Sequence, residues 1–149
     1  MELALAIELD GSQNSVGVAD RSGKVLDSES VAADRGGMVD LTDLIPALDR
    51  LRTRSGRWEG EPVVCGISVG EGPSLLRRDP EAPSAAQALG QTLAAHLGVP
   101  VIVDDVGRAF ALGEGWVGAA KGTPNFASIR IDDVVSGGIV LDGRLLDGG

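Results

Sequence analysis

Three strand-length segments follow one another before the first helical pattern, and this order limits the folds open to the chain. They are 3–9 (LALAIEL), 15–20 (SVGVAD) and 24–32 (KVLDSESVA). The first is almost wholly apolar, as in the middle of a sheet, whereas the third alternates polar and apolar residues as a more exposed strand does. Short turns separate the three, so they are predicted to form a meander.

Helices and strands alternate after this meander. Apolar residues at helical spacing predict a helix from Leu41 to Leu51, with Asp43 as its cap and Pro46 in its first turn. A buried strand is predicted at 62–69 (PVVCGISV).

The later elements continue this alternation. A helix opens with a capping box at 84–87 and ends at Gly98, a strand follows at 99–103, and a helix runs over 105–120. The apolar stripe predicted for that last helix consists of Ala109, Leu112, Trp116 and Ala120. The order β-β-β-α-β-α-β-α predicts an α/β domain of the ribonuclease H-like (actin-like ATPase) type, with helices on the faces of a mixed sheet.

The strand pattern then begins again. Segments 126–132, 137–142 and 144–147 are short strand candidates joined by turns. We therefore predict one domain over 1–121 and, over 122–149, a short β stub that holds the first strands of an incomplete second domain. Such a stub exposes an apolar face and an unpaired edge, so it is expected to pack on the first domain, on another chain, or on further sequence.

Charge and composition exclude several classes of function. The net charge is −9 and aromatic residues make up 3% of the chain, which disfavours nucleic acid and anionic membranes as partners. No apolar run approaches the length of a membrane span. The single cysteine, Cys65, cannot form an internal disulfide, so a cytoplasmic location is expected.

Three stretches carry a resemblance to a known family: LGVPVIVDD (97–105), FALGEGWVGAAKG (110–122) and GGIVLDGRLL (137–146). Across nearly its whole length the chain resembles the ROK family of bacterial sugar kinases and sugar-responsive repressors. The resemblance implies an actin-like ATPase fold and an equivalence to the amino-terminal domain plus the first strands of the carboxy-terminal one. Since ROK proteins are commonly dimers, it also implies a homodimer or another protein partner. The family's zinc motif and the rest of its nucleotide site have no counterpart in these residues.

The first phosphate loop of the family reads Asp-x-Gly-Gly-Thr-Lys, and residues 8–13 stand in its place. An aspartate at position 10 brings a negative charge to the phosphate side of the loop, and glutamine at position 13 replaces the cation. Two like charges about 4 Å apart repel by roughly 4 kcal/mol at an effective dielectric of about 20. The remnants of this loop are Asp10, Gly11, Ser12 and Gln13.

The second phosphate loop of the family reads Gly-Thr-Gly-Ile-Gly-Gly-Gly, where this chain has 132–138 (DDVVSGG). Aspartate and valine replace two glycines that let the backbone curl around phosphate, and a β-branched residue resists a positive φ. The remnants of this loop are Ser136, Gly137 and Gly138. Both loops are predicted to be impaired.

The catalytic base of the family is the aspartate of Glu-Asn-Asp-Ala-Asn, which takes the proton of the sugar hydroxyl. Without a gap, that motif aligns with 104–108, and Val106 stands at the position of the base. A one-residue slip would make Asp105 the base instead. The region 70–83 lacks the asparagine-proline-tryptophan motif with which the family recognises sugar.

Six carboxylates fall at strand ends that line the cleft of this fold. One hypothesis is a divalent-cation site, or even ribonuclease H-like two-metal chemistry; the other is that some of them cap helices or face solvent, Asp105 being the expected N-cap. The six residues are Glu8, Asp10, Asp104, Asp105, Asp132 and Asp133.

Three other features have simple structural interpretations. His96 is interpreted as a surface or half-buried helical residue, and Cys65 as a small core residue rather than a nucleophile. The arginine-rich stretch 51–57 is interpreted as a helix end whose cations suit the dipole, with a regulatory anion site as the alternative.

Three functional hypotheses remain. The first is a catalytically inactive ROK-like lobe that acts in protein association or regulation, with no cofactor, and that dimerises through the stub or through the helix that carries Trp116. The second is part of an active ATP-dependent sugar kinase, with Mg-ATP as cofactor and Asp105 as base. The third is a sugar-sensing regulatory module.

Overall fold

A computed structural model describes residues 2–10, 13–32, 41–54, 59–70, 85–132 and 135–147. These residues form two compact units, 1–103 and 104–149, which we describe separately. The helix at 106–116 therefore belongs to the same compact unit as the strands that follow it. The predicted boundary between the domain 1–121 and the β stub 122–149 remains a prediction.

A five-stranded mixed sheet forms the first unit, with the strand order β3-β2-β1-β4-β5. Strand β1 pairs antiparallel with β2 and parallel with β4. This arrangement confirms the predicted meander and the α/β class. The strands are β1 (Glu2–Asp10), β2 (Gln13–Asp20), β3 (Val25–Val31), β4 (Glu61–Val69) and β5 (Val101–Asp105).

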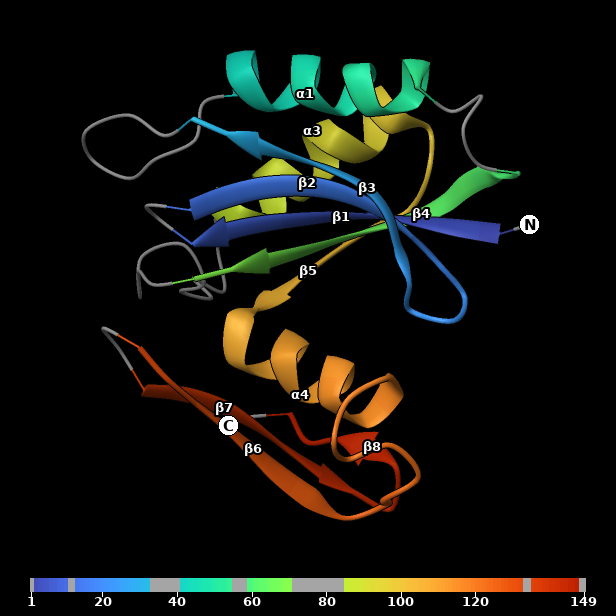
Figure 1. Ribbon diagram of the computed structural model, residues 1–149. Coiled ribbons are helices and arrows are strands. Elements are labelled where there is room, and N and C mark those ends of the chain that lie inside the picture. The colour runs from blue at the N-terminus through green and yellow to red at the C-terminus, as the bar shows by residue number, and fades with distance from the viewer. Residues whose placement is uncertain are drawn as a thin grey trace. The chain divides into compact units, whose positions relative to one another are not determined.

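Two helices, α1 (Leu41–Thr53) and α3 (Ala85–Leu97), cover one face of this sheet (Figure 1). Alternate residues of the central strands point into the core beneath the helices, as the period of two in a strand requires. The largest fully buried side chains in the described part of this unit are Leu3, Leu5, Ile7, Leu44, Leu48, Leu51, Leu93, Val16, Val18 and Cys65.

The ends of both helices test the capping predictions. Helix α1 begins at Leu41, so Asp43 lies inside its first turn and Pro46 lies inside the helix; the prediction that Asp43 caps α1 is wrong. A carboxylate in the first turn still interacts favourably with the helix dipole. Gly98 ends α3 with a φ of 72°, as predicted. The Ser84 half of the predicted capping box lies outside the described residues.

A helix on a three-stranded sheet forms the second unit. Helix α4 (Val106–Trp116) packs on β6 (Phe126–Ile131) and β7 (Val135–Leu141), and β8 (Arg144–Leu145) pairs with β7 (Figure 1). The β7–β8 turn has a positive φ at Asp142 and Gly143, and the two strands pair antiparallel, which confirms the predicted turn between them.

Helix α4 buries a different face from the one its apolar stripe predicts. Gly107 and Ala111 are its buried residues, whereas Leu112 and Trp116 are 51% and 50% exposed. The cause is steric, because the small side is the only one that lets α4 approach the backbone of β7 closely. A Cβ built on Gly138 would lie 2.6 Å from the Cβ of Ala111.

Candidate functional site

The first loop remnant lies at the β1–β2 turn. Asp10 ends β1 and is the register partner of Gln13; Gly11 and Ser12, together with the side chain of Gln13, lie outside what the structure describes. The carboxylate of Asp10 lies over the end of β4, where a Cβ added to Gly70 would come within 2.2 Å of its Oδ1. Nearby, the Ser15 hydroxyl donates to Glu8 at 3.5 Å.

The second loop remnant is part of a paired strand. Ser136 and Gly137 lie in β7, opposite Arg130 and Ile129 of β6. A Cβ on Gly137 would lie 2.3 Å from the backbone oxygen of Ser128, so this glycine serves the close fit of the hairpin.

Asp132, just beyond β6, pairs with Arg130 at 3.0 Å. Asp133 lies outside the described residues. The carboxylate of Asp132 therefore has a partner within the hairpin.

Several polar contacts hold the start of α4. Asp105 is its N-cap, with φ −73° and ψ 155°, and its Oδ1 accepts the backbone N–H of Arg108 at 2.8 Å. This contact satisfies one of the N–H groups that a helix leaves unpaired at its start. The prediction that Asp105 caps the helix is confirmed.

Arg108 links the start of α4 to the chain after β8. Its Nε donates to both carboxylate oxygens of Asp104, at 2.8 and 3.0 Å, and its Nη2 to Asp147 at 2.9 Å. Its Nη1 donates to the backbone oxygen of Leu146. The hydrogen bond to Asp104 is the main cause that raises the pKa of the Arg108 guanidinium. The carboxylates of Asp104 and Asp105, which precede position 106, thus both make contacts within the second unit.

The capping role of Asp105 predicts a specific pair of results. Asp105→Ala is expected to lower the free energy of unfolding by about 1 kcal/mol, because the cap is lost, whereas Asp105→Asn leaves it nearly unchanged, since asparagine caps as well as aspartate. Urea unfolding followed by circular dichroism measures both. Equal losses in the two variants would mean that the carboxylate charge matters, and not the cap.

A family model for the ROK family matches residues 4–149. The chain belongs to the ROK family. Among its relatives, the glucokinase of Halalkalibacterium halodurans is 28% identical over 153 residues, covering 97% of this chain and 46% of the glucokinase. The DNA-binding transcriptional repressor Mlc of Escherichia coli is 36% identical over 61 residues, covering 41% of this chain and 15% of the repressor.

Solved structures give the same fold. The ROK hexokinase of Thermus thermophilus aligns with a TM-score of 0.76 and 22% identity, over 98% of this chain and 48% of the hexokinase. The ROK chain described here therefore spans about half the length of the relatives that it matches over nearly its whole length, and it corresponds to their amino-terminal half.

The carboxylates of this ROK chain do not gather into a metal site in the part that the structure describes. No group of three or more histidine, cysteine, aspartate or glutamate side chains lies together there. Glu8 and Asp10 belong to the first unit, and Asp104, Asp105 and Asp132 to the second. The metal hypothesis gains no support from these residues.

Two candidate residues outside the loops, His96 and Cys65, have structural roles. His96 Nε2 lies 3.0 Å from Asp49 Oδ1, which links α3 to α1. Cys65 is buried, and burial raises the pKa of its thiol to about 12, which makes it a poor nucleophile.

None of the helices among the described residues has the length and apolar character needed to cross a bilayer.

Two arginines near the end of α1, Arg50 and Arg54, are paired with strand β3. Arg50 and Arg54 each donate to Glu29, at 2.7 and 2.5 Å, and Arg54 also lies 3.5 Å from Asp27. The hydrogen bond from Arg50 is the main cause that lowers the pKa of Glu29. Within the stretch 51–57, the cation of Arg54 is therefore paired and Arg52 is exposed; Arg57 lies outside the described residues.

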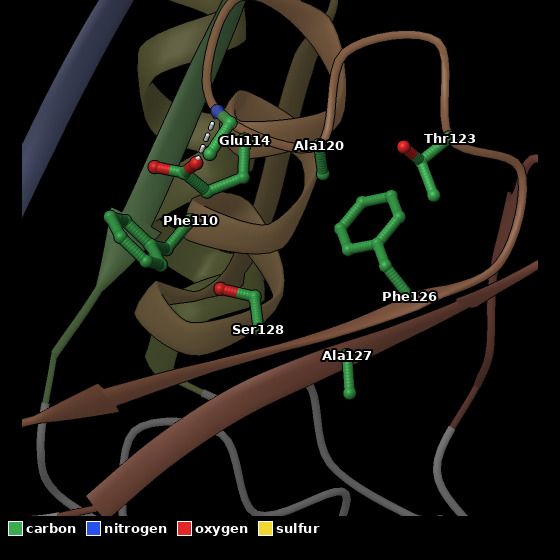
Figure 2. A pocket seen from close by; sticks show the side chains of 8 residues that line it. Phe110, Glu114, Ala120, Thr123, Phe126, Ala127 and Ser128 are labelled. Carbon is green, nitrogen blue, oxygen red and sulfur yellow. Dashed lines mark hydrogen bonds between the residues drawn. The ribbon is translucent and has the colours of Figure 1, made fainter.

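Two features escaped the sequence analysis. Arg108 is one: its spacing of four from Asp104 is that of a helical ion pair and was the available signal. The other is a shallow hollow of about 430 Å³ beside α4, which both phenylalanines of the chain line (Figure 2). Glu114 borders it, and the Glu114 carboxylate accepts the backbone N–H of Ala119 at 2.9 Å. No sequence pattern marks this hollow, because its walls come from separate elements.

Proposed function

We propose that this ROK chain is a catalytically inactive lobe that acts in protein association or regulation. The observation that carries the proposal is the start of α4. Val106 stands at the aligned position of the catalytic base and has no proton-accepting atom, while the neighbouring carboxylate of Asp105 caps the helix. A general base must have a free acceptor within hydrogen-bond reach of the substrate hydroxyl.

The residues present do not fit Mg-ATP. In the first loop Asp10 stands where the family has a glycine and brings a negative charge to the phosphate side, and Gln13 stands where the family has its lysine. In the second loop the glycines that remain in β7 fit the hairpin and helix α4 rather than an open phosphate cradle. We therefore derive no step of phosphoryl transfer through this chain.

Two other functions have one observation each. Part of an active sugar kinase is favoured by the match to glucokinases over 97% of this chain, and it needs Asp105 to leave its cap and serve as base. A sugar-sensing module is favoured by the shorter match to the repressor Mlc. A cytoplasmic location and a protein partner accompany the leading proposal as further expectations.

Calorimetric titration of the chain with Mg-ATP, with and without glucose, tests the leading proposal. We expect no binding heat up to millimolar nucleotide, because both loops oppose phosphate. The glucokinase of Halalkalibacterium halodurans, titrated under the same conditions, is the positive control. Micromolar binding of Mg-ATP to this chain would contradict the proposal and favour the kinase.

A further inference from the structure

The hollow beside α4 lies wholly within the second unit (Figure 2). Phe110 and Glu114 line it from α4, Phe126 lines it from the start of β6, and the loop between the two elements completes it. The described residues that line it include neither Asp105 nor Val106, and none of the phosphate-loop remnants. The hollow is therefore separate from the residues considered for catalysis.

Glu114 carries the one charge among the described residues that line the hollow. Its Oε2 accepts the backbone N–H of Ala119 at 2.9 Å. A Cβ on Gly118 would lie 2.4 Å from the same oxygen, so the loop lies close against this side of the carboxylate. The loop backbone thus holds the negative charge in place before any ligand is present.

The second carboxylate oxygen of Glu114 points away from this N–H in Figure 2. Within the described part of the chain, Glu114 forms no ion pair, and its side chain is half-buried. A ligand that fills the hollow displaces water from this carboxylate, and burying a carboxylate without a hydrogen-bond donor is costly. The ligand must therefore supply a donor, and a cationic donor forms the stronger hydrogen bond.

Two phenylalanine rings supply the apolar part of the hollow. Phe110 lies four residues before Glu114, hence on the same face of α4, and is 42% exposed. The ring of Phe126 packs against the helix, because a Cβ on Gly115 would lie 3.1 Å from its Cζ. An aromatic face attracts an ammonium or guanidinium group, and it also covers the apolar stem of a ligand.

Other classes of ligand fit the hollow less well. A phosphate or a carboxylate would be repelled by Glu114 and by the net charge of −9. A divalent metal ion needs several oxygen ligands, and the described residues bring no three carboxylate, histidine or cysteine side chains together. The volume of about 430 Å³ lies in the range of small-molecule sites.

We propose that the hollow binds a small organic cation, an ammonium or guanidinium group on a short apolar stem. The cationic group donates to the Glu114 carboxylate, and the stem lies against Phe110 and Phe126. This site goes beyond the proposed function, which gives the hollow no role.

The test is a titration of the ¹⁵N-labelled chain with n-butylguanidinium chloride at low ionic strength, followed by NMR. Shifts of the backbone amides of α4 and β6 give the location and the affinity of binding, and we expect saturation in the low millimolar range. Neutral n-butanol and anionic butyrate, which have similar stems, are expected to bind at least tenfold more weakly.

Substitutions test the two parts of the site separately. Glu114→Gln removes the charge and keeps an oxygen that can accept the Ala119 N–H, and it is expected to weaken n-butylguanidinium binding at least fivefold. Phe110→Leu keeps an apolar side chain but removes an aromatic face, and a smaller loss, at least twofold, is expected. Asp142→Asn removes a charge at an exposed turn of the same unit and is the matched control, with unchanged binding expected.

Three results would overturn the proposal. They are no saturable shifts around the hollow, n-butanol binding as tight as that of n-butylguanidinium, and equal losses in Asp142→Asn and Glu114→Gln, which would mean that the overall charge attracts the cation. If Glu114→Gln does not fold, unchanged binding in Phe110→Leu counts against the proposal. Binding of Mg-ATP would refute the inactive role and leave the n-butylguanidinium shifts unchanged, so the two failures are distinguishable.

Discussion

Gly107→Val is expected to destabilise the second unit by about 3 kcal/mol. A Cβ at position 107 would lie 2.3 Å from the nitrogen and 2.9 Å from the Cα and the carbonyl oxygen of Gly137. These are backbone atoms of a paired strand and cannot turn aside as a side chain does, so helix α4 must move away from β7. Overpacking of this kind costs roughly 1–3 kcal/mol, and a branched side chain is at the upper end.

Hydrogen exchange of the β6 and β7 amides measures this effect in the unit where it arises, and urea unfolding gives its size. Gly113→Ala is the matched control, because it lies in the same helix and a Cβ there meets nothing within 4 Å. That control is expected to be neutral or to stabilise by up to about 1 kcal/mol, as alanine favours the helix. Unchanged exchange in Gly107→Val would contradict the close packing of α4 on β7.

Leu48→Ala is expected to lower the free energy of unfolding of the first unit by about 3 kcal/mol. Leu48 lies on α1, is 0% exposed, and belongs to the core cluster under both helices of that unit. Truncating a fully buried leucine removes its transfer free energy and leaves a cavity, which together cost about 2–5 kcal/mol. The shift of the urea midpoint measures the loss.

Leu112→Ala provides the comparison for this prediction. Leu112 is about half exposed on α4, so the same truncation is expected to cost less than about 1 kcal/mol. A loss at Leu112 as large as the loss at Leu48 would mean that Leu112 is covered in solution and that the described face of α4 is not free.

The fold of the first unit could be predicted from the sequence, because the pattern of hydrophobic residues determines its strands and helices. The run 3–9 and the helical spacing of Leu44, Leu48 and Leu51 reflect burial directly, and those residues form the core. Helix α4 is different, because its packing depends on which of its faces carries small side chains. The apolar pattern predicts that the stripe through Leu112 and Trp116 is buried. The buried residues are instead Gly107 and Ala111, because only small residues allow α4 to lie close to the β7 backbone.

The candidate site divides in the same way. The cap at Asp105 could be predicted, because capping depends on a residue type at a helix start. The role of Arg108 could not be derived fully, because two of its partners, Leu146 and Asp147, lie 38 and 39 residues away along the chain. The strand pairing of Ser136 also escaped prediction, since β7 begins at Val135 and not at Gly137.

We propose that Val106 stands where the family has its base and that Asp105, the observed cap of α4, does not replace it. The most direct measurement is glucose-dependent formation of ADP from Mg-ATP by a fusion protein, in which residue 149 is followed by the part of the Halalkalibacterium halodurans glucokinase that this chain does not cover. We predict no turnover above the level without glucose. Turnover that is lost on Asp105→Asn would identify Asp105 as the base and contradict the account.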